Sequence, residues 1–307
     1  MKQSTIIPDY VYVGLEKPKQ ELVVGHDRPR GMTGRAVFDM KVMSEFLFVG
    51  DGRQGFSDHY QEAYYTFFRS KDQITVPGTT LKGAVRSVAE AISLSCVSVR
   101  SEDDVGELRG YPRCNVKKGA RNIEICPACH IFGTTDYRGH VSFSDAIPNE
   151  DIEPRIIKIA ELWEPQIIVP KRKFYRNGQY VKVEDQLPKK YYRYIEAIPK
   201  SSTLTFNLFF ENAWESGLSL AFHSMGIAQD FDIKIGGAKP RCLGSVSFAV
   251  REISLMDQLT ASKIKDPESF VSDILAHNDL IKTEKLEELA NQISSKEPCT
   301  GGLNQWS

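Results

Sequence analysis

Two glycine-containing segments, far apart in the chain, limit its fold more than any other feature. They read VPGTTLKGAVRS at residues 76–87 and GGAKPRCLGSVSF at residues 236–248. Each combines a tight turn with closely spaced lysine and arginine residues, so backbone N–H groups and cations are offered together to an anion. The chain therefore has to fold around two glycine turns that present positive charge.

The first segment predicts a helix whose start is suited to phosphate. Gly78 and the hydroxyls of Thr79 and Thr80 predict a turn and a helix N-cap. The predicted helix carries Lys82 and Arg86 four residues apart on one face. For either glycine segment alone, a capped helix with solvated cations is the simpler interpretation. Both segments in one chain favour a ligand with phosphate groups.

The pattern of apolar residues predicts an α+β fold. We expect a turn at residues 50–52 and a short helix or packed loop at residues 53–71. The main elements are expected to be strands at 35–49, 141–143, 203–210 and 245–253 and helices at 79–95 and 214–229. Strand, helix, strand, strand, helix, strand is the order of a ferredoxin-like core, as in RNA-recognition domains.

Four of the six cysteines have the spacing of a zinc site. Cys126 and Cys129 form a C-x2-C pair, and Cys96 and Cys114 supply the other half if the loop folds back. The segment between them has few large apolar residues, so a structural Zn²⁺ ion would stabilise what a core cannot. The spare candidate ligands are His130 and His140. We expect Cys242 and Cys299 to be plain thiols, since metal or unpaired thiols suit such a chain better than disulfides.

Residues 171–194 combine positive charge with aromatic rings. This stretch holds eight cations, two acids and six aromatic residues, although the net charge of the whole chain is −1. Cations neutralise phosphates and aromatic faces stack on unpaired bases. Asn177-Gly178 is a strong signal for a two-residue hairpin turn. The sequence predicts a projecting β-hairpin that binds single-stranded nucleic acid, with a solvated surface hairpin as the alternative. The predicted contacts are Lys171, Arg172, Lys173, Tyr175 and Arg176.

Both glycine segments resemble the signature of the RAMP superfamily of CRISPR-associated proteins. That family carries P-G-(S/T)-(S/T)-L-K-G-x-(L/V)-R-S in its first half and G-G-x-(K/S)-x-R-x-L-G-x-(V/I) near its end. The sequence CPACHIFGT at residues 126–134 resembles C-P-x-C-x-(L/I)-F-G-(S/T) of backbone subunits in type III and type III-like complexes, and IEAIP at 195–199 resembles another recurrent element. The resemblance covers residues 20–250.

The resemblance implies a guide-RNA-binding backbone subunit of a multisubunit effector complex that recognises complementary target RNA. Its expected partners are guide RNA, target RNA, further copies of the chain and other CRISPR subunits. Lys82 and Arg86, together with Lys239 and Arg241, would hold the guide backbone. The resemblance also implies a thumb hairpin within residues 163–195 and a zinc-binding insertion at residues 96–134.

The resemblance places target cleavage at an aspartate after the first core strand, acting with Mg²⁺ or Mn²⁺. Asp51 in VGDGRQG is the best-placed acid, and Asp58 is the next. The family's usual G-G-x-D spacing is absent, however, and Gly50-Asp51-Gly52 is also a good turn. A subunit that binds RNA while a recruited nuclease cuts it is the alternative.

Other functions are consistent with parts of the sequence. A terminal, non-repeated subunit of the same complex would share these motifs. A stand-alone endoribonuclease that processes precursor guides would need an acid–base set, for which His26 is the one suggestive residue. A zinc-stabilised protein-interaction module without RNA is disfavoured by the basic aromatic stretch.

The C-terminal part of the chain differs from the rest. Residues 251–297 hold six cations and ten acids, and apolar residues within 266–294 have helical spacing. We expect a main domain at residues 1–250 and a helical extension with a tail at residues 251–307. The extension is either a peripheral helix pair or a contact for a neighbouring subunit.

Composition agrees with a globular protein that is not inserted in a membrane. The chain has 307 residues, of which 41% are hydrophobic, and no apolar run approaches the roughly 20 residues that cross a bilayer. The first residues lack a basic stretch followed by an apolar one, so we expect a cytoplasmic location.

Overall fold

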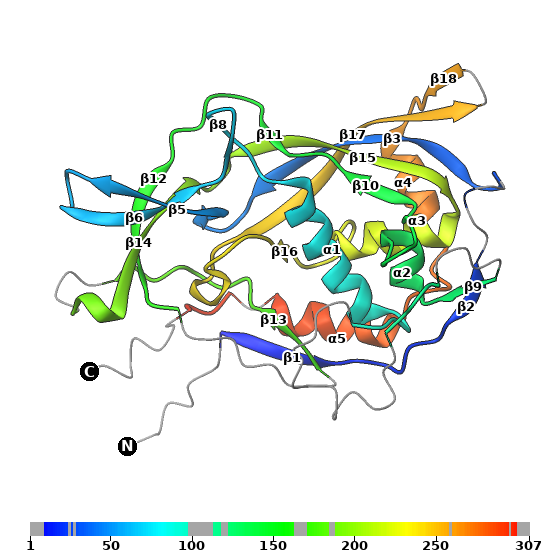
Figure 1. Ribbon diagram of the computed structural model, residues 1–307, viewed down its shortest axis with the longest axis horizontal. Helices are drawn as coiled ribbons and strands as arrows, with labels where there is room; N and C mark the ends of the chain where they lie inside the picture. Colours follow the sequence, from blue (N-terminus) through cyan, green and yellow to red (C-terminus); the bar gives the residue numbers. More distant parts are fainter. Residues whose placement is uncertain are drawn as a thin grey trace.

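The computed structural model describes residues 9–23, 26, 29–97, 113–117, 122–162, 171–183, 188–257, 260–294 and 296–299. The fold is mixed α+β with several sheets, which confirms the predicted class (Figure 1). None of the helices described is long and apolar enough to cross a membrane.

The largest sheet is antiparallel throughout and forms one side of the hydrophobic core. Its strands are, in spatial order, β10 (Val141–Phe143), β15 (Thr203–Ala213), β3 (Met32–Val42), β17 (Ser245–Asp257) and β16 (Ile233–Lys234). Two short strands extend it, β11 (Ile147–Pro148) on β15 and β18 (Thr260–Lys263) on β17. Residues of β3 alternate between the two faces, with Phe38 and Met40 fully buried and Lys41 exposed. This alternation is the signal that predicted the strand.

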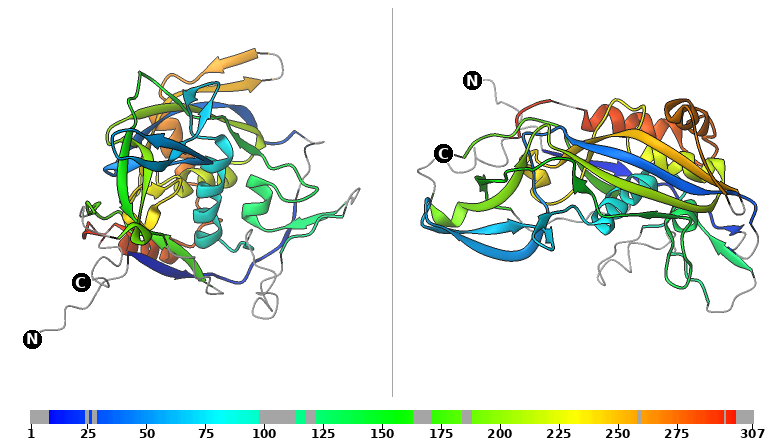
Figure 2. Two further views of the ribbon diagram at one scale, coloured as in Figure 1. Left: turned by 60° about the vertical axis from the view of Figure 1, so that its left-hand side comes forward. Right: turned by 90° about the horizontal axis from the view of Figure 1, so that it is seen from above.

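Helices lie along one side of this sheet (Figure 2). They are α1 (Gly78–Ile92), α2 (Pro127–Phe132), α3 (Glu215–Ser224), α4 (Pro267–Leu275) and α5 (Thr283–Ile293). Phe222 of α3 packs edge-on against Phe38 of β3. The predicted helical spacing near the C-terminus is confirmed, because Val271 of α4 and Leu289 of α5 are buried in the same core. The domain boundary at residue 250 stays a prediction.

A second sheet projects from the body, at the left of Figure 1. It contains β12 (Arg155–Ala160), β14 (Tyr192–Pro199), β6 (Glu62–Phe67) and β5 (Gly50–Ser57), with β4 (Phe46–Leu47) paired to β14. The expectation of a helix or loop at residues 53–71 is wrong, because β5 and β6 form an antiparallel pair there. The aromatic residues of this segment favour strands, which explains the difference.

The predicted hairpin around Asn177-Gly178 is not formed. Strand β13 (Lys171–Tyr175) pairs instead with β1 (Tyr10–Gly14). The Asn177 N–H donates to the carbonyl of Ile293 at 2.7 Å, and a Cβ atom on Gly178 would overlap the carbonyl oxygen of Glu297. The glycine therefore permits a close approach of two backbones, where a turn was expected. The parts of the expected thumb at residues 163–170 and 184–187 lie outside the described residues.

Cys242 and Cys299 were expected to be plain thiols, and this is wrong. The structure pairs them in a disulfide with their Cα atoms 5.7 Å apart. The bridge ties the second glycine segment to residues 296–299. Neither cysteine has a local spacing signal, so only the tertiary structure could reveal the pair.

The remaining elements are short. Two further strand pairs are β2 (Glu21–Val23) with β9 (Ile123–Ile125) and β7 (Arg69–Ser70) with β8 (Gln73–Ile74). Two 3-10 helices are η2 (Lys189–Tyr191) and η3 (Lys239–Arg241).

Candidate nucleic-acid groove and metal centre

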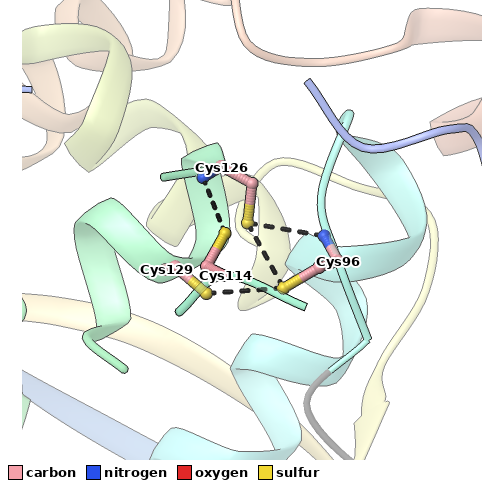
Figure 3. Close-up of side chains that lie close together, drawn as sticks. All are labelled: Cys96, Cys114, Cys126 and Cys129. Carbon is pink, nitrogen blue, oxygen red and sulfur yellow. Dashed lines mark hydrogen bonds between the residues drawn. The ribbon is translucent and has the colours of Figure 1, made fainter. Parts of the chain in front are cut away.

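The four predicted cysteines meet at one buried point (Figure 3). Cys96 follows α1, Cys114 comes from the short segment 113–117, Cys126 precedes α2 and Cys129 lies within α2. Their sulfur atoms all lie within 4.8 Å of one another. The predicted grouping of these cysteines is confirmed.

The geometry of the cluster fits a structural Zn²⁺ ion. Four sulfurs at 2.3 Å from a central ion lie about 3.8 Å from one another. The Cys96 sulfur is 3.5 Å from that of Cys129 and 3.7 Å from that of Cys126. Hydrogen bonds from the other thiols, first of all that of Cys114, lower the pKa of Cys126 and favour its thiolate. A tetrahedral set of four buried cysteines is the ligand arrangement of structural zinc, which would hold the loop against α1 and α2.

The spare candidate ligands lie outside the cluster. His130 stacks on Trp214 with ring centroids 3.9 Å apart. His140 is buried, and its two ring nitrogens bond the Tyr137 hydroxyl at 2.9 Å and the carbonyl of Glu211 at 2.8 Å. His26 stacks on His140 at 4.3 Å. These rings pack against one another, and burial lowers the pKa of His140, so its neutral form is held.

A buried carboxylate links the cysteine cluster to the rest of the site. Glu90 of α1 is fully buried and accepts from Arg86 at 2.9 Å and from Arg172 at 2.7 Å. Arg86 also donates to the carbonyl of Gly133 at 2.6 Å and to the Cys129 sulfur at 3.3 Å. Burial opposes the charge of Arg86, but the carboxylate outweighs it and raises the pKa of Arg86.

The two glycine segments come together across one open groove of about 460 Å³. We call it the glycine groove, and it is lined by Val49, Gly50, Thr79, Thr80, Gly83, Ala84, Ser87, Gly236, Gly237 and Lys239. The first half of α1 forms one wall, and the loop before η3 forms another. None of these lining residues carries a carboxylate. The groove thus offers hydroxyls, glycine backbone, a helix start and a lysine, which suits phosphate.

Glycine is required in the second segment for a physical reason. Gly236 has φ of 74°, and a Cβ atom there would overlap the carbonyl oxygen of Phe48. The N–H of Gly237 donates to that same carbonyl at 2.8 Å. The loop is therefore pinned against the chain between β4 and β5, and it keeps Lys239 beside α1.

The expected N-cap by Thr79 and Thr80 is wrong. The cap residue is Pro77, and no side chain caps the helix from that position. The carboxylate of Asp145 accepts instead from the N–H of Gly78 at 2.8 Å. Asp145 thus places a carboxylate at the start of α1, and both threonines line the glycine groove.

Of the predicted RNA contacts, Lys239 alone lines the groove. Burial, and then the charge of Arg172, lower the pKa of Lys239 to about 8. Lys82 lies on the neighbouring face of α1, where burial and the charge of Arg86 lower its pKa. Arg241 is buried and donates to the carbonyls of Ala160 and Glu161.

The predicted contacts on β13 lie beside β1. Lys171 pairs in register with Gly14, and Tyr175 pairs with Tyr10. The Lys173 ammonium lies 3.8 Å from the centre of the Tyr10 ring. Arg172 points the other way, to Glu90 and to the Ser87 hydroxyl at 2.6 Å. The backbone N–H of Arg176 donates to the carbonyl of Asp9 at 3.1 Å. RNA contact by these residues stays a prediction.

Asp51 lies next to the groove-lining Gly50, in an irregular part of β5. Its carboxylate accepts from the Thr66 hydroxyl at 2.7 Å and from the Arg53 N–H at 2.9 Å. Burial raises its pKa, but these hydrogen bonds outweigh burial and lower it overall. Asp51 is thus ionised at neutral pH. Asp58 is exposed in the turn after β5.

Sequence reasoning missed Glu90. Glu90 had a signal, because it lies four residues after Arg86 on a predicted helix. No sequence signal pointed to Arg172 as the second partner of Glu90, because this ion pair depends on how β13 packs on α1.

We expect about one zinc ion per chain. Cys126→Ser should lose the metal and lower the melting temperature, because a tetrahedral site with three thiolates binds more weakly. Elemental analysis of protein purified without chelator measures this, with Cys242→Ser as the control that keeps the zinc. Wild-type protein without stoichiometric metal would contradict the assignment.

Glu90→Ala should destabilise the fold by about 3–5 kcal/mol, because two partly buried arginines lose their shared, fully buried partner. The control is Arg251→Ala, which breaks the exposed pair with Asp39 and should cost at most about 1 kcal/mol. Urea unfolding of both variants measures the difference. Equal stabilities would show that Glu90 has no special role.

Comparison with known proteins agrees with this arrangement. The RAMP superfamily matches residues 39–247, which is more than half of the chain and includes both sides of the glycine groove. No curated protein matches the chain. RAMP proteins bind CRISPR RNA, typically within complexes. The chain belongs to the RAMP superfamily, which implies a CRISPR-associated RNA-binding protein.

Proposed function

We propose that this chain is a guide-RNA-binding backbone subunit of a multisubunit, RNA-guided CRISPR complex that recognises target RNA. One observation carries the proposal: two motifs at residues 76–87 and 236–248 form opposite walls of the same groove. Superfamily membership supports it as well.

The core is, on this proposal, ferredoxin-like. The strand order β10-β15-β3-β17, antiparallel at every step, supports this assignment. So does the placing of α1 between β3 and β10 and of α3 between β15 and β17 along the chain. The short strands, the second sheet and the C-terminal helices are then additions to that core.

The glycine groove would bind the guide through its sugar–phosphate backbone. The cation of Lys239 stabilises phosphate charge, and the threonine hydroxyls donate to phosphate oxygens. A pKa of about 8 for Lys239 means that the groove loses positive charge as pH rises through that value. These contacts carry no base specificity, as suits a subunit that has to accept any guide sequence.

A backbone subunit is present in several copies along one guide, whereas a terminal subunit is present once. Further copies of the chain, other CRISPR subunits and target RNA are the partners on this proposal. Native mass spectrometry of the complex counts the copies. A single copy per guide would favour the terminal role, with the same groove chemistry.

Gly83 provides a sharp test of the groove. It lies on the groove wall of α1, and an added Cβ atom would meet nothing within 4 Å. Gly83→Glu should reduce co-purifying RNA by about ten-fold, because the carboxylate repels phosphate. Gly83→Gln is the control of matched size, and it should retain more RNA than Gly83→Glu. Equal RNA content in both variants, measured by absorbance and gel after extraction, would contradict a phosphate groove.

Cleavage of the target at Asp51 is a second candidate function. Two observations favour it: Asp51 is next to the groove wall at Gly50, and its lowered pKa keeps the carboxylate ionised. An ionised carboxylate beside a phosphate would be able to hold Mg²⁺ or Mn²⁺. A recruited nuclease is the alternative source of cleavage.

Asp51→Asn separates cutting from binding. The amide retains an oxygen that accepts from Thr66 and Arg53, so the local fold should survive. We expect cleavage of complementary RNA in Mn²⁺ to fall on the order of 100-fold, with guide content unchanged. Unchanged cleavage in the variant would remove Asp51 from the mechanism. A target left intact by the wild-type complex would make this subunit a scaffold.

A further inference from the structure

The second sheet carries a group of aromatic side chains beside a cation, which we call the aromatic platform: Tyr60, Tyr192, Tyr194 and Lys158. Tyr60 stacks on Tyr194 with ring centroids 4.6 Å apart. Tyr192 meets Tyr194 edge-on at 5.7 Å, and the Lys158 ammonium lies 4.0 Å from the centre of the Tyr192 ring. Tyr60 is 40% exposed, and the His59 ring meets it edge-on with centroids 4.6 Å apart.

Regular strands hold Tyr192, Tyr194 and Lys158 in place, and Tyr60 lies in the turn between β5 and β6. Tyr194 of β14 lies opposite Lys158 of β12 and opposite Tyr64 of β6. The Tyr192 hydroxyl donates to Glu62 at 2.6 Å, and this bond raises the pKa of Tyr192 to about 12. The ring is therefore neutral and fixed by both strands and side chains. A fixed aromatic face stacks on a planar ligand at little entropic cost.

The platform opens onto a cleft with a volume of about 1160 Å³. Its wall includes Tyr60, Tyr194 and four lysines, Lys158, Lys182, Lys200 and Lys296. Three carboxylates, those of Glu45, Asp230 and Asp232, also line it. Small-molecule sites occupy about 300–1,000 Å³, so this cleft suits a longer chain. Because lysines and carboxylates both line the cleft, stacking on the tyrosine rings would contribute more to ligand selection than the net charge of the cleft.

The cleft is separate from the glycine groove. Among the described residues, no lining residue of one lines the other. The glycine groove is lined by α1 and the loop before η3, whereas the cleft is lined by β12 and the residues around Asn177-Gly178. An RNA strand bound in the glycine groove would therefore leave the cleft available to a second RNA strand.

We propose that the aromatic platform and its cleft bind an unpaired, single-stranded segment of RNA, with a base stacked on Tyr60. Stacking on tyrosine requires an exposed base face, and lysines along the wall neutralise its phosphates. This inference rests on the proposed function, because it assigns a second RNA surface to a protein that already holds a guide. It deepens that function by naming where RNA outside the guide groove is received.

Fluorescence anisotropy tests the platform with the full-length protein and whatever RNA it retains. The probe is labelled single-stranded oligouridylate of about 16 nucleotides, and an RNA duplex of the same length is compared with it. Tyr60→Ala should weaken oligouridylate binding roughly 5- to 100-fold, whereas Tyr60→Phe, which keeps the ring, should bind like wild type. Phe56→Ala is the matched control, because Phe56 is 62% exposed on the same strand pair but does not line the cleft.

The result separates this inference from the proposed function. Tyr60→Ala should retain co-purifying guide RNA in full, unlike Gly83→Glu. Wild-type protein that holds no RNA contradicts the proposed function itself. Guide retention with equal oligouridylate affinity in wild type and Tyr60→Ala overturns the platform alone. Equal affinity of the wild-type protein for duplex and for oligouridylate also overturns the platform. So does a change of self-association in Tyr60→Ala, measured by light scattering, without a change in RNA affinity, because that result would indicate a protein interface.

Discussion

The shared ion pairs of Glu90 are the interaction on which both candidate centres depend. A fully buried carboxylate is stable only when it is paired, and here two arginines from distant segments pair with it. Arg86 also donates a hydrogen bond to the sulfur of Cys129, and Arg172 donates one to the hydroxyl of Ser87, which lines the groove. The candidate metal centre and the groove are therefore both connected to Glu90, one through Arg86 and the other through Arg172.

The groove itself follows from close backbone contact. Gly236 fits where any Cβ atom would overlap the Phe48 carbonyl, and Gly78 fits where a Cβ atom would overlap the carbonyl of Phe143. Gly78 thus lets the start of α1 approach the end of β10, and Gly236 lets the loop approach the chain between β4 and β5. Positive charge in the groove then comes from Lys239. The arginines that were predicted to contact RNA, Arg86, Arg172 and Arg241, hold the surrounding structure together.

Local signals in the sequence were sufficient for several elements and for the four-cysteine cluster, although they failed for the β5–β6 pair. Strand β10 and helix α1 follow from residue periodicity, and the cluster around Cys126 follows from ligand spacing. Three further features that the sequence analysis misjudged or missed depend on partners far along the chain. Asn177-Gly178 looks like a hairpin turn, yet its glycine serves contact with Glu297. The pairing of Cys242 with Cys299 and of Arg172 with Glu90 likewise depends on how strands pack, which no local pattern encodes.

The position of β3 has a consequence for how the chain folds during synthesis. Its two neighbours in the sheet are β15 at residues 203–213 and β17 at residues 245–257, so both edges of β3 stay unpaired until most of the chain has been made. Folding that waits for such distant pairings is slow, and an unpaired apolar strand is prone to aggregation. Truncation before β17 would leave one edge of this central strand without its partner.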